Sequence, residues 1–312
     1  MQSKIDLFSQ LLRELEAEIG TRDVNDLSLR ALEKSIKYLK AKNVEDFCSQ
    51  FETLVNIISQ TEPKFGILIY NFENLNQYFK ENVCSKDFNE KKWKRVALQG
   101  VKNILKTARG QKLALIENSE KLNLEGKTIL IHDHSHTVQD VIVHNKKLGK
   151  NFKVVIAEQD YDKTHGNIER LHKAGIPFQV VPSYMLSHIH ENVDILFFGA
   201  LTLKDSMHFV MDPGTHSIIS EFHVENIPAY MFIDTSKFSL WESKERGEIF
   251  IHKHLRQHHS KPIEYERIKY SHDRVPVKLF KKIITDKGVL NPGQLKELFD
   301  ERYKASTKKN SS

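Results

Sequence analysis

The sequence has few cysteines and little proline or glycine. Its two cysteines, Cys48 and Cys84, are too few for a disulfide framework or a thiolate zinc site. We expect both to be small buried hydrophobic side chains in a helical region. With 8 prolines and 13 glycines among 312 residues, the chain is neither mainly disordered nor collagen-like.

Long apolar stretches are also missing. The longest runs only from Ile195 to Leu201, whereas a helix needs about 20 apolar residues to cross a bilayer. The N-terminus places acidic residues among its apolar positions and has no small-residue cleavage site, so it does not resemble a signal peptide. These features predict a cytoplasmic protein.

The charge is mildly basic, and 47 Lys and Arg against 41 Asp and Glu leave a formal charge of +6. Spread over the whole chain, this charge makes only a weak field. The basic clusters are Lys91 to Arg95 and the tail from Lys304 to Ser312. We interpret them as a solvated helix face and a disordered tail, and we expect no nucleic-acid partner.

The first part of the chain, residues 1–125, has apolar residues at helical spacing. Gly20 and the pair Asn25 and Asp26 separate some of the segments. The pattern predicts a helical domain of five or six helices. Its clearest stripes are Ile5, Phe8, Leu12, Leu15, Ile19; Leu29, Leu32, Ile36, Leu39; and Phe47, Phe51, Leu54, Ile58.

Residues 126–303 have a different pattern, in which short apolar runs alternate with amphipathic segments of helix length. The runs are Thr128 to Ile131, Val154 to Ala157, Phe178 to Val181, Ile195 to Phe198 and Ala229 to Ile233. This alternation predicts an α/β domain, Rossmann-like, with a mainly parallel sheet buried on both faces. Ligands usually bind at the carboxyl ends of such strands. Residues 304–312 form the expected disordered tail.

The densest group of polar residues follows the first strand and consists of His132, Asp133, His134, Ser135 and His136. Alternate histidines with a carboxylate make a reasonable zinc or iron set. Alternatively, Ser135 is the N-cap of the next helix, and the helix N-terminus offers an anion site.

A metal enzyme should also have ligands at later strand ends. Those ends carry Glu158, Gly199 and Asp234, without a histidine. We therefore expect neither a metal nor another cofactor.

A second helix N-terminus follows the segment Asp212 to Thr215, where Thr215 is a plausible N-cap after Gly214. The segment suits a phosphate, and it equally suits a plain turn with a capped helix.

Seven stretches in this order resemble the family of translation initiation factor 2B alpha, beta and delta subunits, which includes methylthioribose-1-phosphate and ribose-1,5-bisphosphate isomerases. They are GKTILIHDHSHTV at 126–138, VVIAEQD at 154–160, LHKAGIPFQVV at 171–181, VDILFFGA at 193–200, PGT at 213–215, IPAYMFIDTSKF at 227–238 and DRVPVKLFKKIITDKGVLNP at 273–292. The resemblance implies a helical N-terminal domain, a Rossmann-like domain that dimerises, and a sugar-phosphate-sized pocket at the strand ends.

The resemblance also shows departures from the isomerases. Their acid and base positions are occupied here by Asp133 and Leu201, and leucine cannot transfer a proton. Asp212 stands where the family has a lysine, and Asp160 stands where the isomerases have an arginine. Each change opposes binding of a doubly anionic sugar.

The resemblance therefore implies a non-catalytic assembly or protein-binding subunit, related to translation initiation, with a degenerate sugar-phosphate pocket. The expected partners are a second copy, an initiation factor or sister subunit, and a phosphorylated small molecule. The alternative is a sugar-phosphate isomerase in which Asp133 and a nearby histidine act as acid and base. The candidate ligand-binding residues are His132, Asp133, His134, Ser135, His136, Glu158, Asp212, Gly214, Thr215 and Lys237.

The apolar segment at 227–242 supports the dimer. Phe238, Leu240 and Trp241 follow the predicted strand, where we expect a monomer to expose them. A partner copy would bury them. Residues 243–272 of the same chain are the alternative cover.

Overall fold

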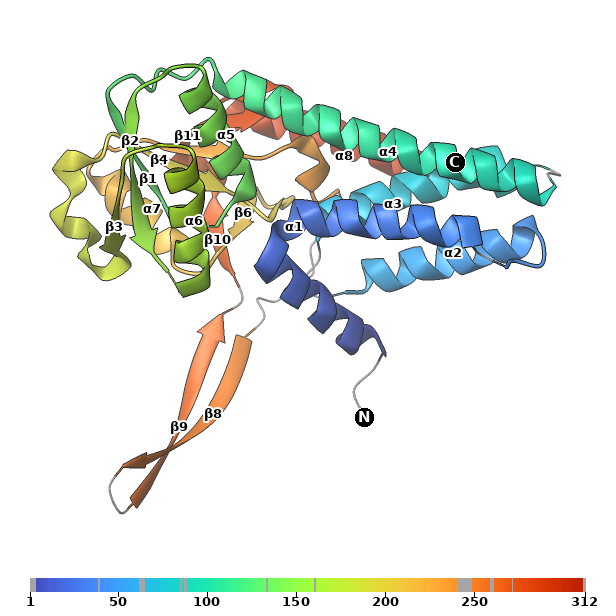
Figure 1. The fold of residues 1–312 in the computed structure, drawn as a ribbon, viewed down its shortest axis with the longest axis horizontal. Coiled ribbons are helices and arrows are strands. Elements are labelled where there is room, and N and C mark those ends of the chain that lie inside the picture. Colours follow the sequence, from blue (N-terminus) through green and yellow to red (C-terminus); the bar gives the residue numbers. More distant parts are fainter. Residues whose placement is uncertain are drawn as a thin grey trace.

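The computed structural model describes residues 4–38, 40–61, 65–84, 86, 89–132, 134–159, 161–240, 249–258, 261–270 and 272–310. A group of long helices lies beside a layered α/β unit, and a two-stranded hairpin projects from the body (Figure 1). Within these residues, no helix is long and apolar enough to cross a membrane.

The helical part begins with α1 (Lys4–Tyr38), which is broken at Gly20, where φ is 76°. A positive φ costs glycine little, so the chain can change direction there. The other elements are α2 (Val44–Ser59), α3 (Gly66–Phe79), the π-helical turn η1 (Lys80–Cys84) and α4 (Glu90–Ser119). Asn43 and Asn89 cap α2 and α4 by accepting backbone N–H bonds.

A seven-stranded sheet in the order β12-β11-β7-β4-β1-β2-β3 forms the centre of the α/β part. All neighbours are parallel except β11 and β12. The strands are β1 (Lys127–Ile131), β2 (Phe152–Glu158), β3 (Phe178–Pro182), β4 (Ile195–Gly199), β7 (Ala229–Phe232), β11 (Phe280–Thr285) and β12 (Gly288–Leu290). The five expected strands are confirmed, as is the fold class.

Helices α5 (His136–Lys147), α6 (Tyr161–Lys173), α7 (Thr215–Val224) and α8 (Pro292–Asn310) accompany the sheet. Short 3₁₀ turns are η2 (Ser183–His188), η3 (His190–Asn192), η4 (Thr235–Lys237) and η5 (Val277–Leu279). A small antiparallel sheet contains β5 (Thr202–Leu203), β6 (His208–Met211) and β10 (Asp273–Pro276). Strands β8 (Ile249–His258) and β9 (Lys261–Tyr270) form the projecting hairpin (Figure 1).

Helix α4 belongs to two hydrophobic cores. Its first half contributes Trp93 and Val101 to the core of the helical part. Its last turns contribute Leu115 and Ile116 to the core on one face of the sheet. The predicted boundary at residue 125 lies in the link between α4 and β1, but the packing of α4 joins the two parts into a continuous body.

The cysteine prediction is wrong. Cys48 and Cys84 form a disulfide bond that joins α2 to the end of η1. The buried residues are their sequence neighbours, Phe47 and Val83, whereas the two cysteines are partly exposed. Buried helix packing brings the two side chains together although 36 positions separate them in the sequence.

The predicted disordered tail also differs from the structure, because α8 continues to Asn310. Two contacts hold its latter half on the body. The Arg302 guanidinium donates to the Tyr70 hydroxyl at 2.9 Å, and the Ser306 hydroxyl donates to the Leu240 carbonyl at 3.5 Å. Helix α8 as a whole also contains many good helix formers, such as Leu, Lys and Glu.

The expected exposure of Phe238 and Leu240 in a monomer is wrong as well. Phe238 is fully buried, with its ring 5.7 Å from that of Phe299 in α8. Leu240 is partly buried against the same core. Helix α8 supplies this cover, whereas the strands described within residues 243–272 form the projecting hairpin. Trp241 lies outside the described residues.

Two glycines of α4 provide a matched test of the packing. A Cβ at Gly100 would overlap the Tyr78 ring, whereas a Cβ at Gly110 would meet nothing within 4 Å. We expect Gly100→Ala to lower the free energy of unfolding by about 1–3 kcal/mol. Gly110→Ala should raise it by about 0.5–1 kcal/mol through helix propensity. Urea unfolding measures both, and equal effects of the two substitutions would contradict this packing.

Candidate functional site

Polar side chains from several elements meet where β1 and β2 end. We call this group the strand-end cluster: His132, Gln159, Lys163, Asp212, Gly214 and Thr215. His132 directly follows β1, Gln159 follows β2, and Lys163 lies in the first turn of α6. The last three precede or begin α7. The topology therefore places these residues at the carboxyl ends of neighbouring parallel strands, where ligands usually bind in such folds.

His132 is the buried centre of this cluster, with 4% of its surface exposed. Its Nε2 lies 3.4 Å from the Pro213 carbonyl and 3.0 Å from the Gln159 side-chain amide. Burial lowers the pKa of His132 below its ordinary value of 6.5, and the Pro213 carbonyl and the Asp212 charge oppose this shift only in part. The ring is therefore neutral at pH 7.

Asp212 is paired within the cluster. Its carboxylate lies 2.7 Å from the Lys163 ammonium, and both side chains are about one quarter exposed or less. From the family resemblance alone, Asp212 replaces a lysine, so positive charge is lost beside the expected phosphate. The structure changes that interpretation, because Lys163 of α6 places a cation at the same position.

The N-terminus of α7 corrects one prediction. Gly214 is the N-cap, with φ at 91°, and Thr215 is the first helical residue. Thr215 is fully buried, and its Oγ1 has no hydrogen-bond partner in the described structure. A Cβ at Gly214 would lie 3.5 Å from His132 Nε2, so the helix terminus sits directly against the histidine.

The other polar residues after β1 have structural contacts. Ser135 is the N-cap of α5 and accepts from the Val138 N–H, as one interpretation expects. His134 packs so closely on α6 that a Cβ at Gly166 would overlap its ring. His136 contacts Asp23 of α1 at 3.2 Å. The hydrogen bond to His136 lowers the pKa of Asp23.

Helix α5 makes three such contacts at four-residue intervals. After His136 come Asp140, 2.5 Å from Lys112, and His144, 2.7 Å from Glu120. These partners lie on or at the end of α4. One face of α5 is therefore tied to the helical part by charged and polar pairs.

Beyond β7, a buried ion pair joins the two parts of the molecule. The Arg22 guanidinium of α1 contacts the Asp234 carboxylate, and both residues are at least nine-tenths buried. Ser236 donates its backbone N–H and its hydroxyl to the same carboxylate. Burial alone would raise the pKa of Asp234, but Arg22, Lys237 and the Ser236 bonds outweigh it, so this pKa is lowered.

The remaining candidates differ in their surroundings. Lys237 is buried, and its ammonium donates to the Ala200 carbonyl at 2.8 Å. Glu158 is exposed at the end of β2. Leu201 is half-buried after β4. Asp133 and Asp160 lie outside the described residues.

The described residues contain no group of three or more His, Cys, Asp or Glu that could hold a metal. The cluster instead offers a cation, a helix N-terminus and two buried oxygens, Thr215 Oγ1 and Gln159 Oε1, that have no hydrogen-bond partner among the described residues. These groups can form hydrogen bonds to a small polar or anionic molecule.

Sequence reasoning missed Gln159, Lys163 and Arg22. Lys163 leaves one signal, because a cation in the first turn of a helix opposes the helix dipole. Arg22 leaves none, since its partner is 212 positions away.

The fold and this site together define a class: a helical domain packed on a Rossmann-like domain, with a small polar site at the strand ends. The model of the Initiation factor 2 subunit family matches residues 20–292. The chain belongs to that family.

The similar curated proteins include "Translation initiation factor eIF2B subunit delta" of Schizosaccharomyces pombe. The match is 30% identical over 123 residues and covers 39% of this chain and 26% of that protein. "Translation initiation factor eIF2B subunit alpha" of Dictyostelium discoideum is 28% identical, with 39% and 38% covered. The chain thus spans between about one quarter and two fifths of the length of these two relatives.

Solved structures share the fold over nearly the whole chain. The Pyrococcus horikoshii translation initiation factor eIF-2B has a TM-score of 0.70 at 19% identity, covering 94% of this chain and 99% of that one. A chain of the tetrameric eIF2B-beta2-delta2 complex from C. thermophilum has a TM-score of 0.71 at 14% identity, covering 96% and 95%.

The lowered pKa of His132 has a consequence for stability. Below pH 6.5 the unfolded chain binds a proton at this position that the folded protein does not bind. Stability from this group is complete above about pH 6.5 and decreases as the pH falls toward the lowered value. We expect the free energy of unfolding to fall by up to about 1.4 kcal/mol per pH unit in this window.

In His132→Gln this part of the decline should be missing. Urea unfolding at pH 7.5, 6.5 and 5.5, chosen to span the window around 6.5, measures the difference in slope. Parallel pH profiles for the two proteins would show that His132 titrates normally.

The buried ion pair generates a second test. Asp234→Asn leaves the Arg22 guanidinium buried without a counter-ion, so we expect a loss of about 3–5 kcal/mol in the free energy of unfolding. The matched control is Asp300→Asn, which removes the exposed partner of Lys296 and should cost under about 1 kcal/mol. If urea unfolding showed similar losses in the free energy of unfolding for both variants, burial would not be what makes the Arg22–Asp234 pair important for stability.

Proposed function

We propose that the protein is a non-catalytic subunit that assembles through its α/β part with a second copy or a sister subunit, in translation initiation or its regulation. Membership of the Initiation factor 2 subunit family supports the link to translation initiation. The observation that carries the non-catalytic role is Leu201, which stands where the resemblance places an acid–base aspartate.

The surroundings of Leu201 also argue against a neighbouring residue supplying the missing acid–base group. Its backbone N–H donates to the Val210 carbonyl at 2.9 Å. The preceding carbonyl, of Ala200, accepts from the buried Lys237 ammonium. The polar groups at this strand end are therefore bonded inward. A hydrocarbon side chain here removes one of the two groups that a proton transfer between adjacent carbons requires.

The strand-end cluster retains, in our proposal, a degenerate pocket for a phosphorylated small molecule. Lys163 and the N-terminus of α7 favour an anion, while the carboxylate of Asp212 already occupies the Lys163 ammonium. The nearby His132 is neutral and adds no charge. These opposing features support weak binding rather than a tight sugar-phosphate site.

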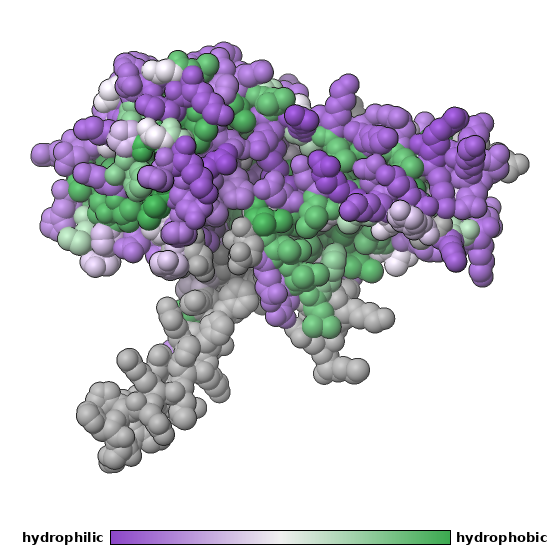
Figure 2. Space-filling model, viewed as in Figure 1, coloured by the Kyte–Doolittle hydropathy of each residue, from purple (hydrophilic) through white to green (hydrophobic). Residues whose placement is uncertain are grey.

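The assembly surface that we propose is the β3 edge of the sheet. Strand β3 ends the strand order, and the described strands pair only with its inner side. Apolar side chains remain exposed there: Val180 at 38%, Tyr184 at 86% and Met185 at 42%. Figure 2 shows a hydrophobic area at this end of the molecule. An unpaired apolar edge favours pairing with another chain.

Beta and delta subunits from C. thermophilum form a tetrameric complex, and by analogy we propose a sister subunit as the alternative partner. An initiation factor is the further partner of such an assembly. We place this work in the cytoplasm.

Light scattering tests the assembly. The purified chain should have about twice its monomer mass of 36.3 kDa, and Val180→Lys should shift it toward the monomer without loss of helical circular dichroism. A matched control is Val224→Lys, since Val224 is also exposed, at 75%, but lies at the end of α7. A wild-type mass near that of the monomer would contradict self-assembly.

Turnover tests the non-catalytic role. Ribose-1,5-bisphosphate and methylthioribose-1-phosphate incubated with the protein should remain unchanged by phosphorus NMR. Conversion above the rate without protein that disappears in Asp133→Asn would instead establish the isomerase alternative.

A further inference from the structure

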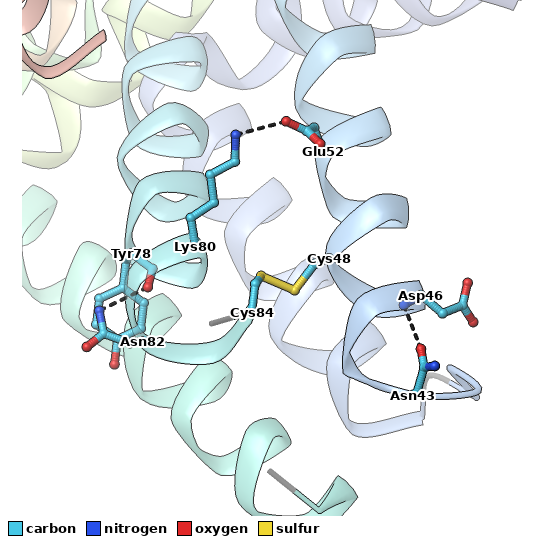
Figure 3. The surroundings of a disulfide bond; sticks show 8 residues. All are labelled: Asn43, Asp46, Cys48, Glu52, Tyr78, Lys80, Asn82 and Cys84. Carbon is cyan, nitrogen blue, oxygen red and sulfur yellow. Dashed lines mark hydrogen bonds and ion pairs between the residues drawn. A yellow bond between two sulfur atoms is a disulfide. The ribbon is translucent and has the colours of Figure 1, made fainter. Parts of the chain in front are cut away.

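The disulfide bond lies at the end of the helical part remote from the sheet. Cys48 is in the second turn of α2, and Cys84 is the last residue of η1, with 6.1 Å between their Cα atoms. Figure 3 shows the two side chains bridging adjacent helical segments. The bond therefore closes a loop that contains most of α2 and all of α3.

One ion pair runs parallel to this bond. Glu52 and Lys80 lie 2.9 Å apart, and each is four residues from a bonded cysteine on the same segment (Figure 3). Both side chains are about half exposed. Exposed pairs of this kind contribute little to stability, so the disulfide is the stronger of the two ties.

The inner side of the same segments is held by aromatic packing. The Phe47 ring lies 4.6 Å from that of Trp93 and 5.3 Å from that of Phe79. Val83 is fully buried in the same core. The half-buried cysteines pack against the outside of this core, and we expect the aromatic packing itself to remain when the disulfide is broken.

The segment that carries Cys84 has an irregular backbone. Residues Lys80–Cys84 form a π-helical turn, which is rare and is found mainly as a local widening of α-helices at functional sites. Side-chain bonds support its start, including Asn82 Nδ2 to the Tyr78 carbonyl at 3.0 Å. At its end, the disulfide ties the turn covalently to Cys48.

We propose that Cys48 and Cys84 form a reversible thiol-redox site whose state controls the local stability of η1 against α2. The co-reactant is a dithiol. One of its thiolates attacks a sulfur of the disulfide and forms a mixed disulfide, and the other cysteine leaves as a thiolate and takes up a proton. The second thiol of the reductant, as its thiolate, then attacks the reductant sulfur of the mixed disulfide and displaces the remaining cysteine, which leaves as a thiolate and takes up a proton. The protein disulfide has then gained two electrons, and the dithiol has become a disulfide.

Three observations support reversibility. Both cysteines are partly exposed, so a thiol can approach. The chain has no third cysteine, so reduction gives a single product and no internal exchange competes. Disulfides in a reducing compartment are usually transient or redox-sensing, and in this last respect the inference rests on the proposed cytoplasmic function.

Breaking the disulfide should lower the local stability of η1 against α2 and leave the helical part folded. Cross-linking removes freedom from the unfolded chain, and the effect grows with the length of the closed loop. Reduction should therefore lower the Tm by roughly 5–10 °C. Amide exchange at residues 80–84 should rise by about tenfold or more, while the aromatic core around Trp93 changes little.

The experiment uses the purified full chain. Alkylation and mass spectrometry count free thiols before and after equilibration of the native protein in glutathione buffers of graded ratio and in excess dithiothreitol. Hydrogen exchange and thermal unfolding follow in both states. The double variant Cys48→Ser/Cys84→Ser should resemble the reduced protein and show no response to dithiothreitol. Glu52→Gln, which removes only the ion pair, should retain the full redox response.

Four results would overturn the proposal: two thiols that stay free in oxidised glutathione, a bond that dithiothreitol reduces only after unfolding, equal exchange at residues 80–84 in both states, or a dithiothreitol response of the double-serine variant equal to that of the wild type. None of these measurements depends on assembly or on a partner. A failure here is therefore distinguishable from a failure of the proposed function.

Discussion

The ion pair between Arg22 and Asp234 is the interaction on which the arrangement of the two parts depends. It crosses from α1 to the end of β7, and water is excluded from both groups. Two charges in such a place are stable only when they meet in good geometry and their remaining hydrogen-bonding positions are satisfied. Ser236 supplies two of those bonds to the carboxylate. An arrangement that separated the helical and α/β parts would break this ion pair.

Neighbouring polar contacts extend this junction. Thr235 donates its backbone N–H to Asp286 at 2.7 Å, and its hydroxyl accepts from Arg302 at 3.2 Å. Arg302 in turn bonds Tyr70 of α3. Since hydrogen bonds and ion pairs are directional, these contacts fix orientation in a way that apolar packing alone does not. The two parts therefore present their surfaces in one defined geometry.

The parallel strands could be predicted because each is a short apolar run of the length that a strand buried on both faces requires. The same pattern predicted that His132 follows a strand, and the turn before a helix predicted Gly214; the structure places the two residues side by side. The partners could not be found. Lys163 reaches Asp212, and Arg22 reaches Asp234, only through the folded chain, and no local pattern records such distances. The disulfide escaped prediction for the same reason.

The pair of Lys163 and Asp212 shows how a site can change its sequence and still contain a cation. The resemblance places a cation in the loop before α7, where this chain has an anion. The cation is instead provided by the first turn of α6, and the two side chains neutralise each other. The region keeps its polarity and loses its surplus positive charge. A comparison of single sequence positions shows only that a cation before α7 is lost. The structure shows that a cation from α6 lies in its place.

Helix α4 is a long, continuous connection between the sheet and the far end of the helical part. Its 30 residues extend for about 45 Å at 1.5 Å per residue. One end is packed against the sheet, and the other supports the helices that carry the disulfide. A tilt of about 5° at the sheet would displace the far end by about 4 Å over a rod of this length. A small adjustment in the α/β part would thereby become a displacement about as large as a side chain at the opposite end of α4.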